Sequence, residues 1–360
     1  MSDHLTYDKS GVNTAQQDRI MPNLIHWVER TFAFQPNTVK LPLGYFANVI
    51  SVGNNLGIAV STDGVGTKII VAQMMNKYDT VGIDCVAMNV NDVICVGATP
   101  LSLLDYIAVE SPHDELMKQL VAGLYKGAEL ASVTIPGGEI AQVGDMIRGA
   151  PGGHGFDLVG TAVGTVPLNQ ILTGKETKDG DIIVGLRSSG VHSNGLSLAR
   201  RIFFETLKWD VGKKMDELGR TIGEELLEPT RIYVQEVLAM LKAKLKIKAL
   251  AHITSTGFLN LSRADADVSY VIDSLPEPHQ IFGLIQHYGA VPDEEMFLTY
   301  NMGIGFCVVV APEDADAVRR IAHDYGVESH VIGHTVSDPK KQVRVPQHRL
   351  VGSGGKFRRS

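Results

Sequence analysis

The sequence has few cysteines, and their placement argues against several classes of protein. Its 360 residues contain three, Cys85, Cys95 and Cys307, and no Cys-x-x-Cys pair. Three cysteines cannot form a disulfide framework, and without close pairs they do not match a zinc site. None lies in the polar, glycine-flanked setting that a reactive thiolate needs, which argues against cysteine–histidine catalysis. Such sparse cysteine favours a reducing compartment, so we expect a cytoplasmic protein.

Long apolar runs and an excess of positive charge are also missing. No apolar run approaches the ~18 residues that a bilayer span requires, so no membrane association is expected. The 33 Lys and Arg residues are outnumbered by 40 Asp and Glu residues, which leaves a formal net charge of -7. This balance argues against general nucleic-acid binding. An anionic ligand would therefore be held by backbone amides, by a few cations or by a metal.

Glycine is abundant, with 37 residues, and the hydrophobic pattern alternates between strands and helices. The length suggests two domains of mixed α/β structure. We predict a domain over residues 1–166, a second over 167–345 and a mobile tail over 346–360. Extended runs are predicted at 46–62, 101–109, 132–136, 155–166, 181–187, 247–253, 268–273, 303–311 and 328–336. Helices are predicted at 80–97, 113–131, 195–207, 224–243 and 312–325.

The first motif with a chemical meaning is TDGVGTK, which follows an apolar strand. Gly64 and Gly66 free the backbone for tight turns and close approach to a ligand. Asp63 supplies a hard oxygen that suits Mg²⁺, Lys68 a point charge that suits phosphate, and Thr67 a hydroxyl. The motif is not a Walker A loop. A hairpin turn with an exposed aspartate and lysine is the alternative interpretation.

The second motif, GIDCVAMNVND, falls on a predicted helix that is small and apolar nearly all round. Asp84, Met88 and Asn91 are spaced so that they share one face, and Asp92 lies beside that face. Carboxylates and amides on such a helix are costly to bury unless they bind something. Hard oxygens of this kind suit a magnesium carried by a nucleotide. The alternative is a helix cap with one exposed polar edge.

Two further segments carry glycines beside polar side chains. Gly138 and Glu139 close a predicted strand, a usual place for ligand contact in α/β folds. The loop SSGVHSNG links a strand to a helix, where free amides favour phosphate, and it carries His192 and Asn194. A serine-rich helix cap and a structural histidine are the alternatives. His252 ends another predicted strand, where it could face a cleft.

Together these motifs resemble one enzyme family. TDGVGTK, GIDCVAMNVND, GGE and SSGVHSNG stand in order, followed by LLEPTRIYV, AHIT and YNMGIGF. This order resembles the phosphoribosylformylglycinamidine cyclo-ligases, also called AIR synthetases, from about residue 7 to about residue 336. The resemblance implies a two-domain α/β fold in which the N-terminal sheets of two subunits pair into a β-barrel, so that the enzyme is a homodimer. It also implies use of ATP and Mg²⁺ to close formylglycinamidine ribonucleotide into aminoimidazole ribonucleotide in purine synthesis.

The resemblance also implies roles for individual residues. The catalytic residues it implies are Asp63, Lys68, His192 and Asn194. The nucleotide contacts it implies are Thr62, Gly64, Gly66, Thr67, Asp84, Asn91, Gly138 and Glu139. The metal ligands it implies are Asp63, Asp84, Asp92 and Glu139.

The sequence departs from the family pattern in several loops. The family's glycine-rich segment reads LPLGYFA here, from Leu41 to Ala47, and Met21 takes the place of a usual lysine. The segment after Glu139 lacks a hydroxyl and a carboxylate, and the one after His252 lacks two glycines. Two alternatives therefore stay open: another ATP-using enzyme of the superfamily and a non-catalytic nucleotide-binding paralogue. Selenophosphate synthetase is disfavoured, because residues 1–84 contain no cysteine.

Overall fold

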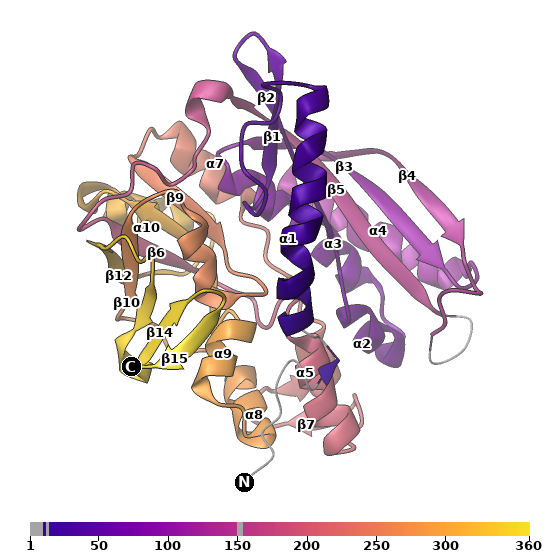
Figure 1. The fold of residues 1–360 in the computed structure, drawn as a ribbon. Coiled ribbons are helices and arrows are strands. Elements are labelled where there is room, and N and C mark those ends of the chain that lie inside the picture. The colour runs from indigo at the N-terminus through magenta and orange to yellow at the C-terminus, as the bar shows by residue number, and fades with distance from the viewer. Residues whose placement is uncertain (1–9, 12–13, 150–153) are drawn as a thin grey trace.

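The computed structural model describes residues 10–11, 14–149 and 154–360, and in these residues most strands belong to two sheets (Figure 1). The start of the matched stretch at residues 7–9 lies outside this part of the chain. The first sheet has the order β1-β2-β5-β3-β4. Its strands are β1 (Asn48–Gly53), β2 (Leu56–Gly64), β3 (Thr99–Val109), β4 (Thr134–Gln142) and β5 (Phe156–Pro167).

The first sheet is antiparallel except at one edge. β1 and β2 form the hairpin predicted around Gly53, and β5 lies between β2 and β3, antiparallel to both. β3 and β4 are parallel, and α4 (Asp114–Ala131) connects them, as parallel neighbours need a crossover. The predicted strand at 132–136 is longer than expected, because β4 continues through Gly138 and Glu139 instead of ending before them.

Two helices cover one face of this sheet. α3 (Asp79–Cys95) is buried over nearly its whole length, and it packs against β2, β5 and α4. Its small residues allow this close approach: a side chain at Gly82 would collide with the backbone of α4, and one at Gly123 with the backbone of α3. α3 therefore forms a layer between the sheet and α4, which explains why its sequence is apolar on almost every side.

The other face of the first sheet is partly exposed. Leu104 and Tyr106 of β3 are each 43% exposed there. Val159 and Val163 of β5 are only half-buried, although neighbouring positions on the strand are fully buried. This alternation is the pattern of a sheet with one packed face and one open face. We call the open side, lined by Leu104, Tyr106, Val159 and Val163, the open face.

The second sheet has the order β15-β14-β13-β10-β12-β6-β11-β9. Its strands are β6 (Ile182–Arg187), β9 (Ile247–His252), β10 (Val268–Ile272), β11 (Ile304–Val310), β12 (Ser329–Ser337), β13 (Val343–Val345), β14 (Leu350–Ser353) and β15 (Lys356–Arg359). The helices in this half are α5 (Leu196–Arg200), α6 (Ile222–Leu226), α7 (Val234–Lys242), α8 (Gln280–Gly289), α9 (Asp293–Thr299) and α10 (Ala315–Asp324). A short hairpin joins β7 (Lys214–Met215) and β8 (Arg220–Thr221).

Two predictions for this half are wrong. The expected mobile tail is an antiparallel hairpin, in which β14 and β15 extend the sheet and bury Leu350 and Phe357. The expected helix over 224–243 is two helices, α6 and α7, with an irregular segment between them. Pro229 explains the break, because proline disfavours the helical conformation in the residue before it and donates no hydrogen bond.

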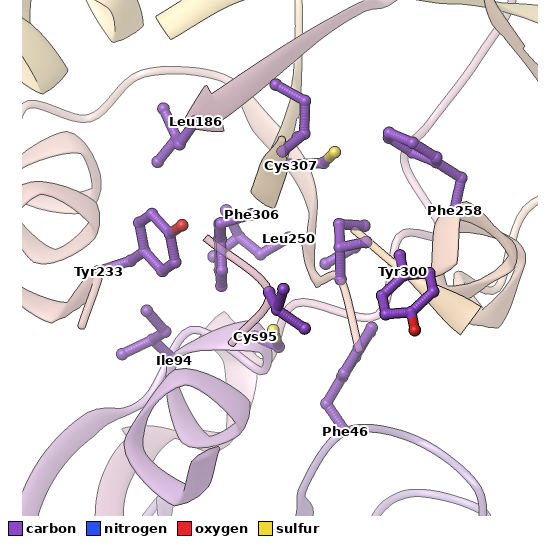
Figure 2. Close-up of a cluster of buried hydrophobic side chains, with 14 of the residues drawn as sticks. Phe46, Ile94, Cys95, Leu186, Tyr233, Leu250, Phe258, Tyr300, Phe306 and Cys307 are labelled. Atoms are coloured by element: carbon purple, nitrogen blue, oxygen red, sulfur yellow. The ribbon is translucent and has the colours of Figure 1, made fainter. Parts of the chain in front are cut away.

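One hydrophobic core joins the two halves. Ile94 and Cys95, near the end of α3, are buried in the same cluster as Tyr233, Leu250 and Phe306 of the second half (Figure 2). α3 also contacts α7 and β9 directly.

Two further helices complete the N-terminal half, and no described helix has the properties of a membrane span. α1 (Thr14–Arg30) is exposed at nearly all of its described side chains, and α2 (Lys68–Met75) begins inside the TDGVGTK motif. Among the described residues, none of the helices is both long and apolar enough to cross a bilayer.

Candidate active site at the junction of the two halves

A buried ion pair links the TDGVGTK motif to α3. The Nζ atom of Lys68 lies 2.8 Å from Oδ2 of Asp84, and neither side chain has any exposed surface. Lys68 also donates to the carbonyl of Glu228, and Asp84 accepts from the backbone amide of Thr230. Burial lowers the pKa of Lys68, and the negative charge of Asp84 partly offsets this shift. The pair thus anchors the segment between α6 and α7.

Asn91 performs the same task two turns further along α3. Its amide group donates to the carbonyl of Arg231, and its oxygen accepts from the amide of Tyr233. Asp84 and Asn91 therefore share one face of α3, as their spacing predicted. Both hold the backbone of residues 228–233, which we call the docked segment.

Three of the residues with predicted site roles are buried inside the protein. Lys68 was expected to contact a phosphate, Asp84 a metal and Asn91 a nucleotide. All three are fully buried, and their polar groups already bond to one another or to the docked segment. A ligand could reach none of them without separating the two halves.

The docked segment in turn holds the SSGVHSNG loop. Ser189 donates through Oγ to the carbonyl of Pro229, and the hydroxyls of Ser193 and Thr230 lie 3.1 Å apart. Nε2 of His192 accepts from the amide of Ser189. His192 has a φ of 63° and is buried, so its ring organises the loop from inside.

His192 is held in its neutral form. Burial lowers its pKa well below the usual value, and the neighbouring positive charge of Lys68 acts in the same direction. Its Nδ1 atom is buried without a hydrogen-bond partner among the described residues. The predicted substrate-side role of His192 would need the loop to move, whereas Asn194 beside it is only half-buried.

Asp63 and Asp92 form the acidic pair of the site. Asp63 lies one residue before the end of β2, is exposed over part of its surface, and accepts through Oδ1 from the amide of Gly64. Partial burial of the carboxylate, together with the negative charge of Asp92, raises the pKa of Asp63 to about 6. Asn89 of α3 donates to the carbonyl of Asp63 and fixes the strand end beside the helix. Two carboxylates from different elements are thereby held near each other.

A cavity of about 270 Å³ opens beside Asp92 and beside Thr62, the residue before Asp63. It brings together Asp92, the end of β2 and Arg263, which lies between β9 and β10. The rest of its lining is the diverged loop before β1. The full lining is Pro42, Leu43, Gly44, Tyr45, Phe46, Ala47, Asn48, Val60, Ser61, Thr62, Asp92 and Arg263. The Arg263 guanidinium lies 4.8 Å from the centre of the Phe46 ring, so a cation is fixed in the cavity that Asp92 also lines.

Glu139 lies apart from the acidic pair. In the strand register Asp63 is opposite Gly160, Gly160 is opposite Asp105, and Asp105 is opposite Gly138. Paired residues point to the same side of a sheet, so Glu139, one residue further on, points to the open face. The described residues contain no group of three or more Asp, Glu, His or Cys side chains that could hold a metal. The predicted set of four carboxylate ligands is therefore not assembled within one copy.

The remaining predicted residues lie on three different parts of the site. Thr62 lines the cavity, and its hydroxyl bonds to the carbonyl of Gly160. Gly66 has a φ of 72° at the turn into α2, a conformation that favours glycine. Thr67 lies 2.9 Å from the hydroxyl of Ser197 in α5 and so bridges the two halves.

Three residues of the site were missed or given little weight in the sequence. Arg263 has no motif around it that marks it, because its partners come from residues 42–62 and 92. Asn89 lies inside the GIDCVAMNVND motif, on a different face from the residues that drew attention. His252 was noted only for its place at a strand end, yet its Nδ1 lies 2.9 Å from Oδ1 of Asp92.

The acidic pair fits a magnesium ion that arrives with a nucleotide. Mg²⁺ is usually bound by one or two protein carboxylates, with phosphate oxygens and waters completing its shell. Asp63 and Asp92 supply that number of carboxylates, and the pKa of Asp63 is raised first by burial and then by the nearby negative charge of Asp92. A cation placed between them would relieve this repulsion.

Comparison with known proteins finds similar sequences over almost the whole chain. The AIR synthase related protein family matches with its N-terminal domain at residues 44–166 and its C-terminal domain at residues 178–346. A phosphoribosylformylglycinamidine cyclo-ligase of Methanocaldococcus jannaschii is 47% identical, over 97% of this chain and 96% of its own length. A protein of the same name from Methanothermobacter thermautotrophicus is 45% identical, over 95% of this chain and 97% of its own length.

Solved structures share the fold at low identity. The HypE–HypF complex contains a chain with a TM-score of 0.62 and 18% identity, with 92% of this chain and 98% of that chain covered. Thiamine-monophosphate kinase from Stenotrophomonas maltophilia has a TM-score of 0.60 and 18% identity, with 88% and 93% covered. These structures establish the two-domain α/β fold that the motifs predicted. The extent and identity of the sequence matches show that the chain belongs to the phosphoribosylformylglycinamidine cyclo-ligase family.

Proposed function

We propose that this protein is an ATP-dependent cyclo-ligase of purine biosynthesis. It closes formylglycinamidine ribonucleotide into aminoimidazole ribonucleotide, with ATP converted to ADP and phosphate. The observation that carries the proposal is the pair Asp63 and Asp92 beside a cavity that holds Arg263, in a chain of this family. The interpretation as a non-catalytic paralogue is not favoured, because both carboxylates and the elements that hold them are intact.

The proposed reaction depends on charge neutralisation more than on a nucleophilic side chain. The γ-phosphoryl group passes to the formamide oxygen. The amidine nitrogen then attacks the carbon that bears this oxygen, the carbon–oxygen bond breaks, and phosphate leaves. When bound, magnesium neutralises charge on the transferred phosphoryl group. Asp63 and Asp92 would hold that ion, and Arg263, whose guanidinium matches phosphate geometry, would bind an anionic group in the cavity. The ion pair of Lys68 and Asp84 would act at a distance, by holding the docked segment.

The experiment that tests this proposal is product formation by the purified protein. With ATP, Mg²⁺ and formylglycinamidine ribonucleotide, we expect ADP and aminoimidazole ribonucleotide in equal amounts. ATP binding without product, by protein that is folded, would contradict the cyclo-ligase proposal and support a nucleotide-binding module.

The proposed homodimer would cover the open face. Leu104 and Tyr106 are exposed there although they belong to an interior strand of the sheet, and a contiguous exposed apolar surface indicates an interaction site. Glu139 and Thr62 lie on or beside this surface. Pairing of two N-terminal sheets would therefore also enclose predicted nucleotide contacts. This supports a site that a second copy of the chain completes.

Leu104→Arg is expected to convert the proposed dimer into a folded monomer. An arginine in the centre of an apolar interface would be desolvated without a partner, which costs several kcal/mol. Size-exclusion chromatography with light scattering measures the mass, and circular dichroism checks the fold. Val121→Arg, on the exposed side of α4, is the matched control and should leave the mass unchanged. A monomeric wild-type protein, or an unchanged mass in the Leu104 variant, would contradict the open-face dimer.

Two further proposals concern organisation and location. We propose that residues 1–166 form the nucleotide-binding and dimerisation domain, which agrees with each half having its own sheet. The second domain, expected over residues 167–345, then also includes β14 and β15, since both strands belong to its sheet. We also propose a cytoplasmic location. The three cysteines are free and buried, and this suits a compartment in which thiols stay reduced.

A further inference from the structure

A histidine from the second half contacts the acidic pair of the first half. Nδ1 of His252, the last residue of β9, lies 2.9 Å from Oδ1 of Asp92 on α3. The His252 side chain is 1% exposed, whereas the Asp92 side chain is 17% exposed and lines the cavity. The histidine therefore lies behind the carboxylate, and the carboxylate lies between the histidine and any ligand.

The hydrogen bond fixes which nitrogen carries the proton. An ionised carboxylate only accepts hydrogen bonds, so Nδ1 of His252 is the donor. A neutral ring then has its lone pair on Nε2, which is buried without a partner among the described residues. Among the described residues, the imidazole therefore makes one hydrogen bond, to Asp92, and this bond orients the carboxylate.

The position of the pair makes this contact more than a packing detail. Asp92 comes from the N-terminal half and His252 from the C-terminal half, with 160 residues between them. Carboxylates that bind metals are usually held by a second hydrogen bond, and loss of that partner typically weakens metal binding by about 10–100-fold. In this protein the partner comes from the other half of the molecule.

We propose that His252 is a positioning residue, which holds Asp92 in the orientation that a divalent cation requires. This inference rests on the proposed function, because it takes Asp92 as a ligand of the nucleotide-bound metal. It assigns His252 no contact with substrate and no proton transfer. The cation site of the first half is then only formed when β9 is docked against α3.

Binding of Mn²⁺ in the presence of ATP, measured by electron paramagnetic resonance, tests the proposal without turnover. We expect His252→Ala to weaken Mn²⁺ binding by about 10–100-fold. His252→Asn should stay close to wild type, since its amide nitrogen can take the place of Nδ1, whereas His252→Gln places its amide where Nε2 was. The matched control is His348→Ala. His348 contacts Asp293 at 3.1 Å in a second histidine–aspartate pair, and its removal should leave Mn²⁺ affinity unchanged.

A double variant separates positioning from a general effect on folding. In an Asp92→Asn background, His252→Ala should cause no further loss of Mn²⁺ affinity, because the histidine acts only through the carboxylate. Wild-type affinity in folded His252→Ala, or equal affinities of the Asn and Gln variants, would overturn this inference alone. If the alanine variant does not fold, the Asn and Gln pair decides. A wild-type protein that binds no Mn²⁺ with ATP would overturn both this inference and the metal site of the proposed function.

Discussion

Asp63→Asn is expected to lower turnover by at least about 100-fold without destabilising the fold. An amide keeps the shape of the side chain and can still accept the hydrogen bond from Gly64, but it cannot supply the negative charge that a magnesium site needs. Losing one preorganised electrostatic group at a reacting phosphate typically costs this much. Steady-state kinetics with ATP and formylglycinamidine ribonucleotide measures the effect.

The same substitution has a predictable effect on stability in the absence of ligands. The pKa of Asp63 is raised from 3.8 to about 6 by burial and by Asp92, so the folded protein holds this proton more tightly than the unfolded chain does. As the pH rises from about 4 to about 6, ionisation of Asp63 lowers the free energy of unfolding of the wild type. Below about pH 4 both states are protonated and no penalty exists.

The melting temperature of Asp63→Asn should therefore be higher than that of the wild type at pH 7 and equal to it at pH 4. Differential scanning fluorimetry at several pH values measures this difference. Mg²⁺ with ATP should raise the melting temperature of the wild type and have little effect on the variant. Asp216→Asn, in an exposed turn, is the control and should change neither activity nor this pH dependence. Loss of stability with normal turnover would instead mark Asp63 as a structural residue.

The sequence marked Asp63 and Asp92 as candidate metal ligands, but it did not show what the polar residues around them bond to. Asp63 follows an apolar strand, Asp92 lies on a largely apolar helix, and hard oxygens in these places suggested magnesium. Asp84 and Asn91 carried the same signal, because polar groups on an apolar helix need partners. The sequence could not distinguish a ligand from a distant part of the chain as that partner. The docked segment lies about 140 residues away, and only folding brings it to α3.

Local signals misled the prediction in two other places. The last residues read as a mobile tail because they are rich in glycine and basic side chains. Gly354 and Gly355 in fact make the tight turn of a hairpin, whose buried face carries Leu350 and Phe357. The GGE motif was placed at a strand end, but Gly138 lies inside β4, where its missing side chain leaves room for Asp105. In both cases glycine serves close packing or turning, and the sequence does not show which.

Lys68→Met is expected to destabilise the folded protein severely, even in the absence of any ligand. It leaves the Asp84 carboxylate buried without its cation, and such a loss typically costs about 3–5 kcal/mol. At about 2–4 °C per kcal/mol, the range for a domain about as large as either half of this chain, the melting temperature should fall by about 6–20 °C. Thermal unfolding without nucleotide measures the effect, which should not depend on Mg²⁺.

Two further variants show whether this loss comes from the buried charge. Lys68→Met combined with Asp84→Asn should be more stable than Lys68→Met alone, because the neutral amide can still accept from Thr230 without burying an unpaired charge. Lys77→Met removes a lysine from the half-exposed pair with Asp79, which is also 2.8 Å long, and should cost at most about 1 kcal/mol. Equal losses of stability in Lys68→Met and Lys77→Met would contradict the structural role of the buried pair. If Lys68→Met is folded and of normal stability but inactive, Lys68 takes part in the reaction itself. Its charge would then be available to a phosphate and not used up by Asp84.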